Sequence, residues 1–387
     1  MHGYRIGFDA KRAYHNTTGL GHYSRTLIQS LATCYPEHQY YLLNPKPANR
    51  LFTPSFTNVL EIQPKKLIDK LLRSFWRSNS VKKDLIKYNI QLYHGLSHEI
   101  PMGIQHINIR SVVTIHDLIF ERYPHQYNPI DVQIYRFKFK NACKHADKII
   151  AISKQTKEDI IHYYGINPDK IDICYQSCNV SFSSRVDVKE IDLLKQRYGL
   201  PQNYFLYVGS IIERKNLLVI CKAMQQLGSK LPMPLVVIGN GTGYKKKIQT
   251  FIQEQHLENK IIFLSDNPVA KKDFAFKTAQ NFPALYQGAT AVIYPSIFEG
   301  FGIPVLEALW SKVPVITSKT SCLPETGGNA AYYIDPYSTE EMANAMLAVS
   351  DNALLRANMI EKGWVYAQQF THQRCATAVM DVYKKLL

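Results

Sequence analysis

The sequence predicts an α/β protein made of two domains, each built on a parallel sheet. Its 387 residues, 46% of them hydrophobic, are enough for two substantial cores. Short apolar strands alternate with helical patterns along the chain, as they do in doubly wound folds. A polar, serine-rich stretch at 180–188 interrupts this alternation and is interpreted as the linker, so the first domain is predicted to cover 1–185 and the second 186–365.

Composition excludes several classes of protein. No apolar run is long enough to span a bilayer, and the segment 1–9 is too short and too soon charged for a signal peptide, so we expect a cytoplasmic protein. The seven cysteines lack CxxC spacing, which argues against a disulfide framework and against a structural zinc site. Free, buried thiols are expected instead.

The chain is strongly basic, with a formal net charge of +15. Residues 1–185 hold 25 Lys and Arg against 14 Asp and Glu, so the first domain carries most of the excess. Such a balance indicates an anionic partner, which can be nucleic acid, a membrane surface or a phosphorylated substrate.

Strands are predicted from short apolar runs that end at turn residues. In the first domain they are 4–9, 39–43, 90–95, 111–115, 146–153 and 170–174. In the second domain they are 204–209, 234–239, 261–264, 291–294, 313–317 and 331–335.

The first strand leads into a glycine-containing segment. Thr17 and Thr18 are candidate helix caps, and Gly19-Leu20-Gly21 is predicted as a tight turn ahead of a helix. A Gly-x-Gly between a strand and a helix is a weak signal for a phosphate loop, and a plain turn explains it equally well.

The segment 65–87 combines apolar and basic residues at helical spacing. One stripe holds Leu67, Ile68, Leu71, Leu72, Phe75 and Trp76, and the other side holds Lys65, Lys66, Lys70, Arg73 and Arg77. Such a helix can lie on an anionic bilayer with its aromatic residues in the interface. It can equally pack its stripe into the domain core and expose its lysines.

His116 follows the predicted strand 111–115, at the end of the strand where doubly wound sheets bind ligands. A lone histidine is more often structural, so the sequence leaves both roles open. Asp117 is expected to fix the loop rather than to take part in chemistry.

Arg214 and Lys215 lie between the strand that ends at Gly209 and the next helix. Two adjacent cations at a helix start are repelled by the helix dipole, so the position favours a bound anion. Arginine can bind a diphosphate with two bonds and lysine can bind it as a point charge. Gly239 ends the following strand and forms a turn with Gly241.

The segment 291–309 gives the strongest functional signal. It opens as a buried strand, breaks at Pro295, and continues as a loop with Gly300 and Gly302 into a helix with Pro304 in its first turn. The free amides and the dipole of that helix favour an anion at its start.

Two carboxylates, Glu299 and Glu307, bracket this turn with seven residues between them. A carboxylate accepts two hydrogen bonds well, so one glutamate can hold a ribose and the other a sugar. Each alone also fits a plain role, as a solvated loop residue or as a favoured charge near a helix start.

This E-x7-E motif resembles the nucleotide-sugar site of retaining glycosyltransferases of family 4, which have the GT-B architecture of two Rossmann-like doubly wound domains facing a cleft. The resemblance implies that Glu307 holds the ribose, and that Glu299 with the backbone around Phe301 and Gly302 holds the donor sugar. Arg214 and Lys215 are expected to stabilise the leaving phosphate.

Further donor-site roles follow from the same resemblance. They concern the helix start near Val305 and Leu306, and the strand-end glycines Gly209 and Gly239. The string VVTIHDLIFERYP resembles the first-domain motif of the family, which implies that His116 contacts the donor sugar. Gly19 and Gly21 are expected opposite the donor diphosphate.

The last residues also resemble the family, and several other positions depart from its pattern. Residues 361–387 resemble the terminal helix pair of the family, so 366–387 is predicted to cross back to the first domain. Ser210 stands where many relatives have arginine, Gln176–Asn179 replaces an Asn-Gly pair, and His372 stands where tryptophan is common. The loop after 264 is longer than usual, which weakens identification of the base.

The resemblance implies transfer of a hexose from a nucleotide diphosphate sugar to a hydroxyl, with retention and without a covalent glutamate intermediate. GDP-mannose is the expected donor, because the HDL and G-S-x-x-x-R-K-N strings resemble bacterial mannosyltransferases of surface polysaccharide synthesis; a UDP- or dTDP-sugar is the alternative. No D-x-D pair occurs, so neither a metal nor another cofactor is expected. The acceptor is expected to be a glycan, lipid-linked, with the enzyme on the inner face of the membrane.

Two other classes of protein compete with this interpretation. The charge alone also fits a nucleic-acid-binding protein, which predicts aromatic residues interleaved with cations, a pattern found only at 65–87. A phosphorylase of similar shape normally needs a pyridoxal site and a much longer chain. Nucleic acid is therefore not the expected partner.

Overall fold

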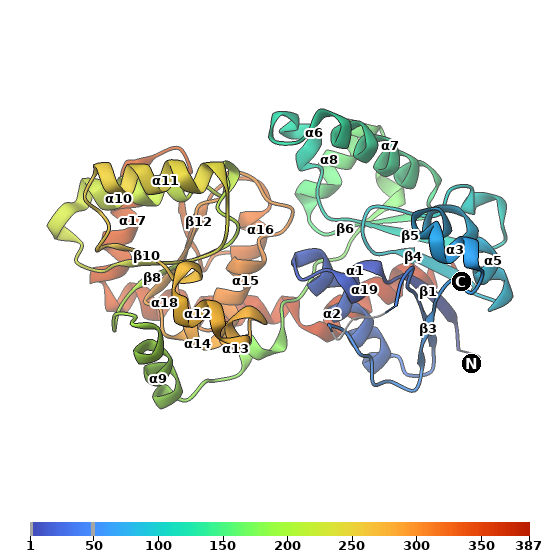
Figure 1. The fold of residues 1–387 in the computed structure, drawn as a ribbon, viewed down its shortest axis with the longest axis horizontal. Coiled ribbons are helices and arrows are strands. Elements are labelled where there is room, and N and C mark those ends of the chain that lie inside the picture. The colour runs from blue at the N-terminus through green and yellow to red at the C-terminus, as the bar shows by residue number, and fades with distance from the viewer. Residues whose placement is uncertain (1–2, 48–50) are drawn as a thin grey trace. The chain divides into compact units, whose positions relative to one another are not determined.

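The computed structural model describes residues 3–47 and 51–387, which fold into two compact units. The first unit comprises Met1–Cys178 with Phe370–Leu387, and the second comprises Asn179–Gln369. In each unit helices cover both faces of a parallel sheet (Figure 1).

The change between the units comes earlier than the predicted boundary at Arg185. The reason is the short turn η5 (Val180–Ser183), whose Phe182 packs edge-on against Tyr286 of the second unit at a centroid distance of 5.1 Å. The predicted linker is therefore partly anchored. At the other end the chain returns to the first unit at Phe370 rather than at residue 366.

The first sheet has the order β3-β2-β1-β4-β5-β6-β7, and all its pairs are parallel. Its strands are β1 (Arg5–Asp9), β2 (Gln39–Leu43), β3 (Val59–Ile62), β4 (Leu92–Gly95), β5 (Arg110–Ile115), β6 (Lys148–Ala151) and β7 (Ile171–Ile173). The sequence prediction missed β3, an edge strand whose exposed Leu60 and Glu61 hide the apolar signal. The strand order reverses between β1 and β4, which makes that point the expected ligand crevice of the unit.

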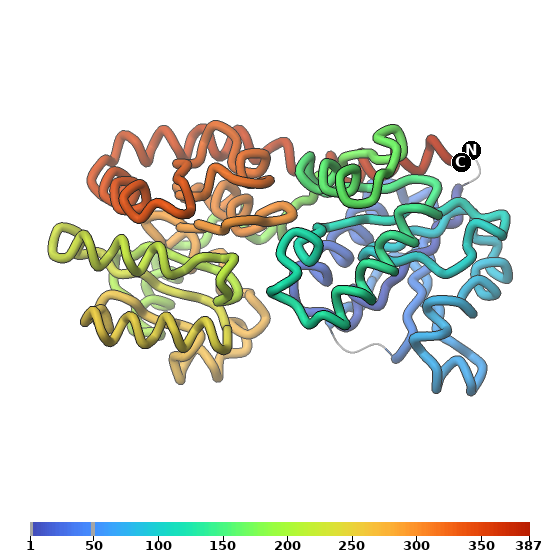
Figure 2. The backbone as a smooth tube through the Cα atoms, turned by 90° about the horizontal axis from the view of Figure 1, so that it is seen from above, coloured from blue at the N-terminus to red at the C-terminus, as the bar shows by residue number. Residues whose placement is uncertain are grey.

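The helices of the first unit lie around this sheet. They are α1 (Lys11–His15), α2 (Gly19–Cys34), α3 (Leu67–Leu71), α4 (Arg73–Phe75), α5 (Val81–Lys87), α6 (Ile119–Arg122), α7 (Pro129–His145), α8 (Lys154–Tyr164) and α19 (His372–Lys384). The terminal helix α19 packs on α2 and buries Val379 and Tyr383 in the same core as β1 (Figure 2). This docking completes one face of the first unit with the last residues of the chain.

The basic segment 65–87 is not one helix. The backbone leaves the helical region at Leu72, with φ −97° and ψ 56°, and a π-helical turn, η1 (Trp76–Ser80), follows α4. Trp76 is buried and donates to Asp84 at 2.8 Å, and Arg77 is paired with two carboxylates, so neither belongs to the expected faces. The other five apolar residues are exposed, which shows that the core-packing interpretation was wrong.

The second sheet has the order β10-β9-β8-β11-β12-β13, again all parallel. Its strands are β8 (Phe205–Val208), β9 (Leu235–Ile238), β10 (Ile261–Phe263), β11 (Ala291–Tyr294), β12 (Val315–Ser318) and β13 (Tyr332–Ile334). All six correspond to predicted strands. The order reverses between β8 and β11.

Ten helices of the second unit surround this sheet in the described part of the chain. They are α9 (Val188–Tyr198), α10 (Leu217–Leu227), α11 (Gly243–Glu254), α12 (Pro268–Lys272), α13 (Phe274–Lys277), α14 (Phe282–Gln287), α15 (Ile303–Trp310), α16 (Leu323–Gly327), α17 (Thr339–Asp351) and α18 (Ala353–Ala367). The long loop expected after residue 264 is largely helical, since it contains α12 and α13.

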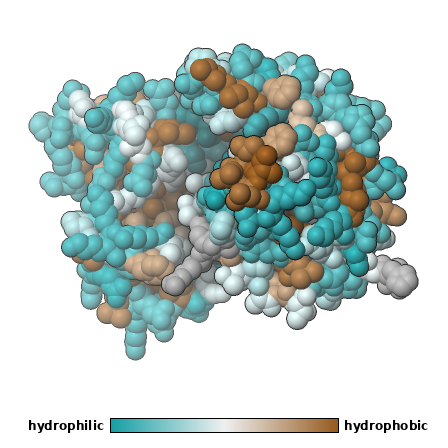
Figure 3. Space-filling model, turned by 45° about the vertical axis from the view of Figure 1, so that its right-hand side comes forward, coloured by the Kyte–Doolittle hydropathy of each residue, from teal (hydrophilic) through white to brown (hydrophobic). Residues whose placement is uncertain are grey.

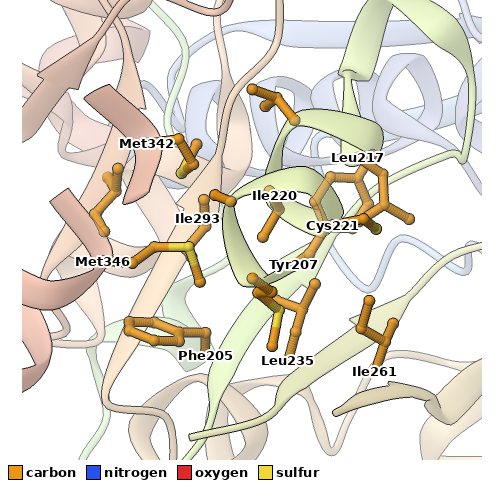
Figure 4. Close-up of a cluster of buried hydrophobic side chains, with 14 of the residues drawn as sticks. Phe205, Tyr207, Leu217, Ile220, Cys221, Leu235, Ile261, Ile293, Met342 and Met346 are labelled. Carbon is orange, nitrogen blue, oxygen red and sulfur yellow. The ribbon is translucent and has the colours of Figure 1, made fainter. Parts of the chain in front are cut away.

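Apolar side chains from strands and helices meet in one core on a face of the second sheet. Phe205 of β8 and Ile293 of β11 pack in one cluster with Ile220 of α10 and Met346 of α17 (Figure 4). This packing holds β8 and β11 side by side, so the loops that follow them emerge together at the carboxyl edge of the sheet.

Cysteines and possible membrane spans give two further results. All seven cysteines are free thiols and six of them are buried, as predicted. Across residues 3–47 and 51–387, we find no helix with both the length and the apolar character that crossing a bilayer requires.

Candidate active site

The helix α15 starts at the turn predicted from the 291–309 pattern. Gly302 is its N-cap with φ +92°, a left-handed value, and a side chain there would lie 2.7 Å from Leu323 Cδ2. The amides of Val305 and Leu306 bond to the Gly302 carbonyl at 2.9 and 3.5 Å. These two amides therefore bond within the helix. Pro304 has no N–H, so the first-turn N–H that points out of the helix start is that of Ile303.

Three charged side chains meet where β8 and β11 end. Arg214 and Lys215 lie on the 3-10 turn η6 (Glu213–Lys215), and Glu299 lies on the loop after β11. The Arg214 Nη1–Glu299 Oε1 distance is 2.8 Å and the Lys215 Nζ–Glu299 Oε1 distance is 3.7 Å. The topological switch point of the second sheet thus holds two cations and one carboxylate.

Hydroxyl groups complete the surroundings of Glu299. Tyr294 and Ser296 each donate to Oε1, at 2.9 and 2.8 Å, and Lys215 donates to the Tyr294 hydroxyl at 2.8 Å. Burial alone would raise the pKa of Glu299, but Lys215 and Arg214 with these two hydroxyls lower it to about 2. These contacts all converge on Oε1.

The pKa of Glu307 is shifted in the opposite direction to that of Glu299. Glu307 lies on α15, and the Tyr286 hydroxyl donates to its Oε2 at 2.7 Å. Burial raises the pKa of Glu307 to about 7, although Tyr286 and Lys215 act against the shift. This carboxyl group therefore titrates close to neutral pH before any ligand binds.

Gly209 and Gly239 bring two strand-end loops into backbone contact. A Cβ on Gly239 would lie 1.8 Å from the Gly209 carbonyl oxygen, and Gly209 has φ +154°. A Cβ on Gly209 would lie 3.2 Å from the Lys215 Cδ and Nζ atoms. Both glycines therefore help to place Lys215, whether or not they also touch a ligand.

His116 lies in the first unit at the end of β5, as predicted, and is buried. Its Nε2 is 2.9 Å from the Leu96 carbonyl, which can only accept, so Nε2 carries the proton and Nδ1 is left as an acceptor. Burial lowers the pKa of His116 to about 4, so the ring is neutral at neutral pH. Asp117 accepts the Ile119 amide at 3.1 Å, which fits its expected loop role.

Gly19 and Gly21 do not form a turn ahead of the helix, contrary to prediction, because they belong to the first turn of α2. Asn16, rather than a threonine side chain, caps this end and accepts from the amides of Thr18 and Gly21 at 2.8 and 3.1 Å. A Cβ on Gly21 would lie 1.9 Å from the Asn16 carbonyl oxygen, whereas Gly19 faces open space. Close packing explains Gly21, and no packing constraint explains Gly19.

Two family models match consecutive parts of the chain. The model described as "Glycosyltransferase Family 4" matches residues 17–182, and the model described as "Glycosyl transferases group 1" matches residues 190–364. The chain belongs to the family 4 glycosyltransferases.

Curated relatives of this glycosyltransferase agree with the assignment. O-antigen chain mannosyltransferase B of Escherichia coli is 28% identical over 303 residues, which cover 77% of this chain and 75% of the relative. O-antigen chain mannosyltransferase RfbU of Salmonella typhimurium is 28% identical over 275 residues, which cover 70% of this chain and 68% of the relative.

Solved structures show the same GT-B fold. A glycosyltransferase from Rickettsia africae has a TM-score of 0.73 at 17% identity, covering 100% of this chain and 99% of its own. Sucrose-phosphate synthase from Thermosynechococcus elongatus has a TM-score of 0.76 at 19% identity, covering 99% of each chain. HepE from Anabaena in complex with UDP and glucose has a TM-score of 0.71 at 14% identity, covering 98% of this chain and 99% of its own.

The structure divides the predicted site residues of this glycosyltransferase between the two units. Arg214, Lys215 and Glu299 meet in the second unit, and Lys215 acts on the pKa of Glu307 there. His116 lies in the first unit with the two glycines of α2.

Sequence reasoning missed the tyrosines that bond to the two glutamates. Tyr294 ends β11 and Tyr286 lies on α14, and both are almost completely buried. Burial makes them look like core residues in a sequence. A signal was available, because a tyrosine at the last position of a parallel strand lies at the edge where ligands bind.

Within residues 3–47 and 51–387, no group of three or more His, Cys, Asp or Glu side chains is placed to hold a metal ion.

Proposed function

We propose that this glycosyltransferase transfers mannose from GDP-mannose to a hydroxyl of a lipid-linked glycan in cell-surface polysaccharide synthesis, with retention at the anomeric carbon. The observation that carries the proposal is the charge cluster of Arg214, Lys215 and Glu299 at the switch point of the second sheet. The choice of mannose rests on the relatives from Escherichia coli and Salmonella typhimurium, both named as O-antigen mannosyltransferases.

The reaction breaks the bond between the anomeric carbon and the diphosphate oxygen. The nucleoside diphosphate leaves with the electron pair, and Arg214 and Lys215 stabilise the charge that grows on it. The acceptor hydroxyl oxygen then bonds to the same face of the anomeric carbon. Its proton passes to the departing phosphate oxygen, so atoms and charge balance.

Glu299 binds the donor sugar in this scheme and is not a nucleophile. Its Oε1 is already paired with Arg214 and accepts from Tyr294 and Ser296, and a pKa of about 2 makes it a weak base. Its Oε2 accepts from a sugar hydroxyl. The neutral His116 of the first unit offers Nδ1 as an acceptor for a sugar hydroxyl.

Glu307 holds the ribose in this scheme. Its ionised form accepts from both hydroxyls of a vicinal diol, while Tyr286 fixes the orientation of the carboxylate. The proposal requires no metal, because Arg214 and Lys215 supply the positive charge that metal ions give in other transferases. Activity unchanged by a chelator is the expected result.

A thermal-shift panel of GDP-, UDP- and dTDP-sugars without metal tests the donor. The proposal expects stabilisation by the GDP class and its loss in Glu307→Ala. A UDP-sugar is the second candidate, since the similar Anabaena structure contains UDP and the helical segment α12–α13 follows β10, near which the base is expected. Stabilisation by UDP-sugars alone would replace the mannose assignment, and retention of DNA without any sugar-nucleotide response would contradict the enzyme.

We also propose that the first unit binds an anionic bilayer through a surface formed by α3 and α4. The exposed fractions of Leu67 and Leu71 are both 74%. The other apolar members are Ile68, Leu72 and Phe75, and the exposed cations among them are Lys65, Lys66, Lys70 and Arg73. Apolar patches stand out from the mostly hydrophilic surface on the face in Figure 3. Apolar side chains ringed by lysine and arginine fit the interface of an anionic membrane.

Sedimentation with vesicles tests this surface. The Leu67→Ser/Leu71→Ser/Phe75→Ser variant is expected to lose binding to vesicles that contain phosphatidylglycerol. The matched control replaces exposed apolar residues of the second unit, Val188→Ser/Leu193→Ser/Leu354→Ser, and should bind as the wild type does. Equal binding by both variants would contradict the membrane proposal.

A further inference from the structure

The switch point of the first sheet also carries a charge cluster, which the sequence patterns did not indicate. Asp9 ends β1, Lys11 and Arg12 follow it on α1, and Glu99 lies on the loop after β4. Since β1 and β4 are parallel neighbours at which the strand order reverses, these residues emerge at the crevice where doubly wound sheets bind ligands.

Both carboxylates of this cluster are already paired. Arg77 contacts Asp9 Oδ2 at 2.5 Å through Nη2 and Glu99 Oε2 at 2.9 Å through Nη1. Lys138 contacts Glu99 Oε2 at 3.3 Å. Arg77 and Lys138 thus balance the two acids, which are committed before any ligand arrives.

Lys11 and Arg12 are the two cations of this cluster that have no carboxylate partner in the described chain. Both are half-buried, and within residues 3–47 and 51–387 neither forms an ion pair. Burial and then Arg77 lower the pKa of Lys11, and Arg12 lowers it further, while Asp9 and Glu99 act in the opposite direction. Two half-buried cations without a counter-ion are less comfortable than two cations in solvent, so the position favours a bound anion.

Two observations on the loop after β4 also point to a ligand. Ser97 is buried, and its Oγ has no hydrogen-bond partner within the described chain. The next residue, His98, has φ +65°, which is strained for a residue other than glycine. Orphaned polar groups and strained backbone are both more common at binding sites than elsewhere.

The cluster lies close to the histidine that the proposed function assigns to the donor sugar. Glu99 directly follows His98, whose ring centroid lies 5.1 Å from that of His116. Burial is the main cause of the low pKa values of both histidines, and Arg12 adds to both shifts. The charge cluster and His116 therefore lie at the same carboxyl edge of the first sheet.

We propose that Lys11 and Arg12 bind a phosphate or diphosphate group carried by the acceptor. The two cations left without partners match the two negative charges of a diphosphate that links a lipid to a sugar. The inference rests on the proposed function, because it concerns the acceptor of that reaction. It deepens that function by making the enzyme specific for phosphate-bearing acceptors.

The ion pairs connect this cluster to the surface formed by α3 and α4. Arg77, which holds Asp9 and Glu99, lies on η1, and η1 begins directly after Phe75. A lipid-linked diphosphate bound at Lys11 and Arg12 therefore lies close to the apolar, basic surface of α3 and α4. The last residue of that surface, Phe75, stands two positions before Arg77. This favours a lipid over a free sugar phosphate as the source of the phosphate.

Calorimetric titration of the full chain tests the proposal, with GDP present at saturation to occupy the second unit. The probes are geranyl diphosphate, N-acetylglucosamine 1-phosphate, inorganic pyrophosphate and geraniol. Binding of geranyl diphosphate by the wild type is expected. Lys11→Gln/Arg12→Gln should weaken it at least about tenfold, since contacts to charged groups are lost.

The control removes the same charge elsewhere on the first unit. Lys140 and Lys144 are exposed on α7, and Lys140→Gln/Lys144→Gln should bind geranyl diphosphate as the wild type does. Circular dichroism checks that each variant folds. Tighter binding of N-acetylglucosamine 1-phosphate than of geranyl diphosphate, with the same loss in the double variant, would support a sugar phosphate as the acceptor group.

Three outcomes would overturn the inference. They are no binding of any phosphate probe to the wild type, equal binding by the wild type and Lys11→Gln/Arg12→Gln, and a loss of GDP affinity in that variant. The last outcome would assign the cations to the donor. A wild type that fails to bind GDP would instead refute the proposed donor, and the probe titrations in its absence would still decide the role of Lys11 and Arg12.

Discussion

The two glutamates of the E-x7-E motif lie one on each side of a single turn, yet their surroundings differ sharply. Glu299 contacts two cations and two hydroxyls, which lower its pKa to about 2. Glu307 receives one tyrosine hydroxyl, and burial raises its pKa to about 7. One motif thus supplies a permanent charge and a carboxyl group that titrates near neutral pH.

This difference teaches that sequence spacing fixes where the carboxylates lie, and that their neighbours fix what they can do. Glu299 is prepared before the donor binds, because its charge and orientation are set by the protein. In the proposed donor complex, Glu307 binds in its ionised form, which a ribose diol would favour. The proposed donor site should therefore respond differently to changes at its two ends.

Removing a cation from Glu299 is expected to have the largest effect. In Arg214→Ala, the leaving phosphate loses a charge and Glu299 loses its shortest ion pair, so kcat should fall by about 10²- to 10³-fold. Steady-state rates with GDP-mannose and a lipid-linked acceptor measure this. Arg197→Ala, an exposed arginine of the same unit, should keep the wild-type rate, and an unchanged kcat in Arg214→Ala would remove Arg214 from the reaction.

The turn between the two glutamates should be sensitive to a single methyl group. In Gly302→Ala the new Cβ meets Leu323 Cδ2 at 2.7 Å in a left-handed conformation, so the free energy of unfolding should fall by about 1–3 kcal/mol. Urea unfolding measures the loss. Gly19→Ala, where nothing lies within 4 Å, is the control and should be neutral or slightly stabilising. Equal stability of both variants would show that the turn tolerates a side chain.

Replacing Glu307 should weaken donor binding without removing the charge cluster. Glu307→Gln keeps the shape and loses the double acceptor for the ribose, so the affinity for GDP-mannose should fall by about tenfold. Calorimetry of the variant measures the change. An affinity equal to that of the wild type would mean that the ribose lies elsewhere.

The two tyrosines give the smallest and most specific effect. Tyr286→Phe removes a bond that lowers the pKa of Glu307, so the pH midpoint of donor binding should move upward by about one unit or less. Tyr294→Phe removes a bond to Glu299, whose pKa lies far below the tested range, so the midpoint should stay in place. Equal shifts in both variants would contradict the separate environments of the two carboxylates.

Much of the fold followed from the sequence, because buried parallel strands form apolar runs that end at turn residues. All strands of the second sheet were predicted, whereas the half-exposed β3 of the first was missed. The prediction of a single helix over 65–87 was wrong, because regular spacing does not show that the backbone leaves the helical region at Leu72. Nor does spacing show that Arg77 turns inward to Asp9.

The candidate site was predictable where parallel strands end side by side. Arg214, Lys215 and Glu299 follow β8 and β11, so their convergence required only the strand order. The pKa values of Glu299 and Glu307 were not predictable, since they depend on tyrosines that look like core residues. Lys11 and Arg12 were overlooked because no motif contains them.

The most direct test of the account is the pH dependence of GDP-mannose affinity, measured by calorimetry from about pH 6 to about pH 8. Both phosphates of GDP-mannose are esterified and do not titrate in this range, so a change reports on the protein. The account predicts that affinity rises with pH as Glu307 ionises, levels off above its pKa of about 7, and becomes independent of pH in Glu307→Gln. A flat profile in the wild type, or a rise that persists in Glu307→Gln, would contradict it.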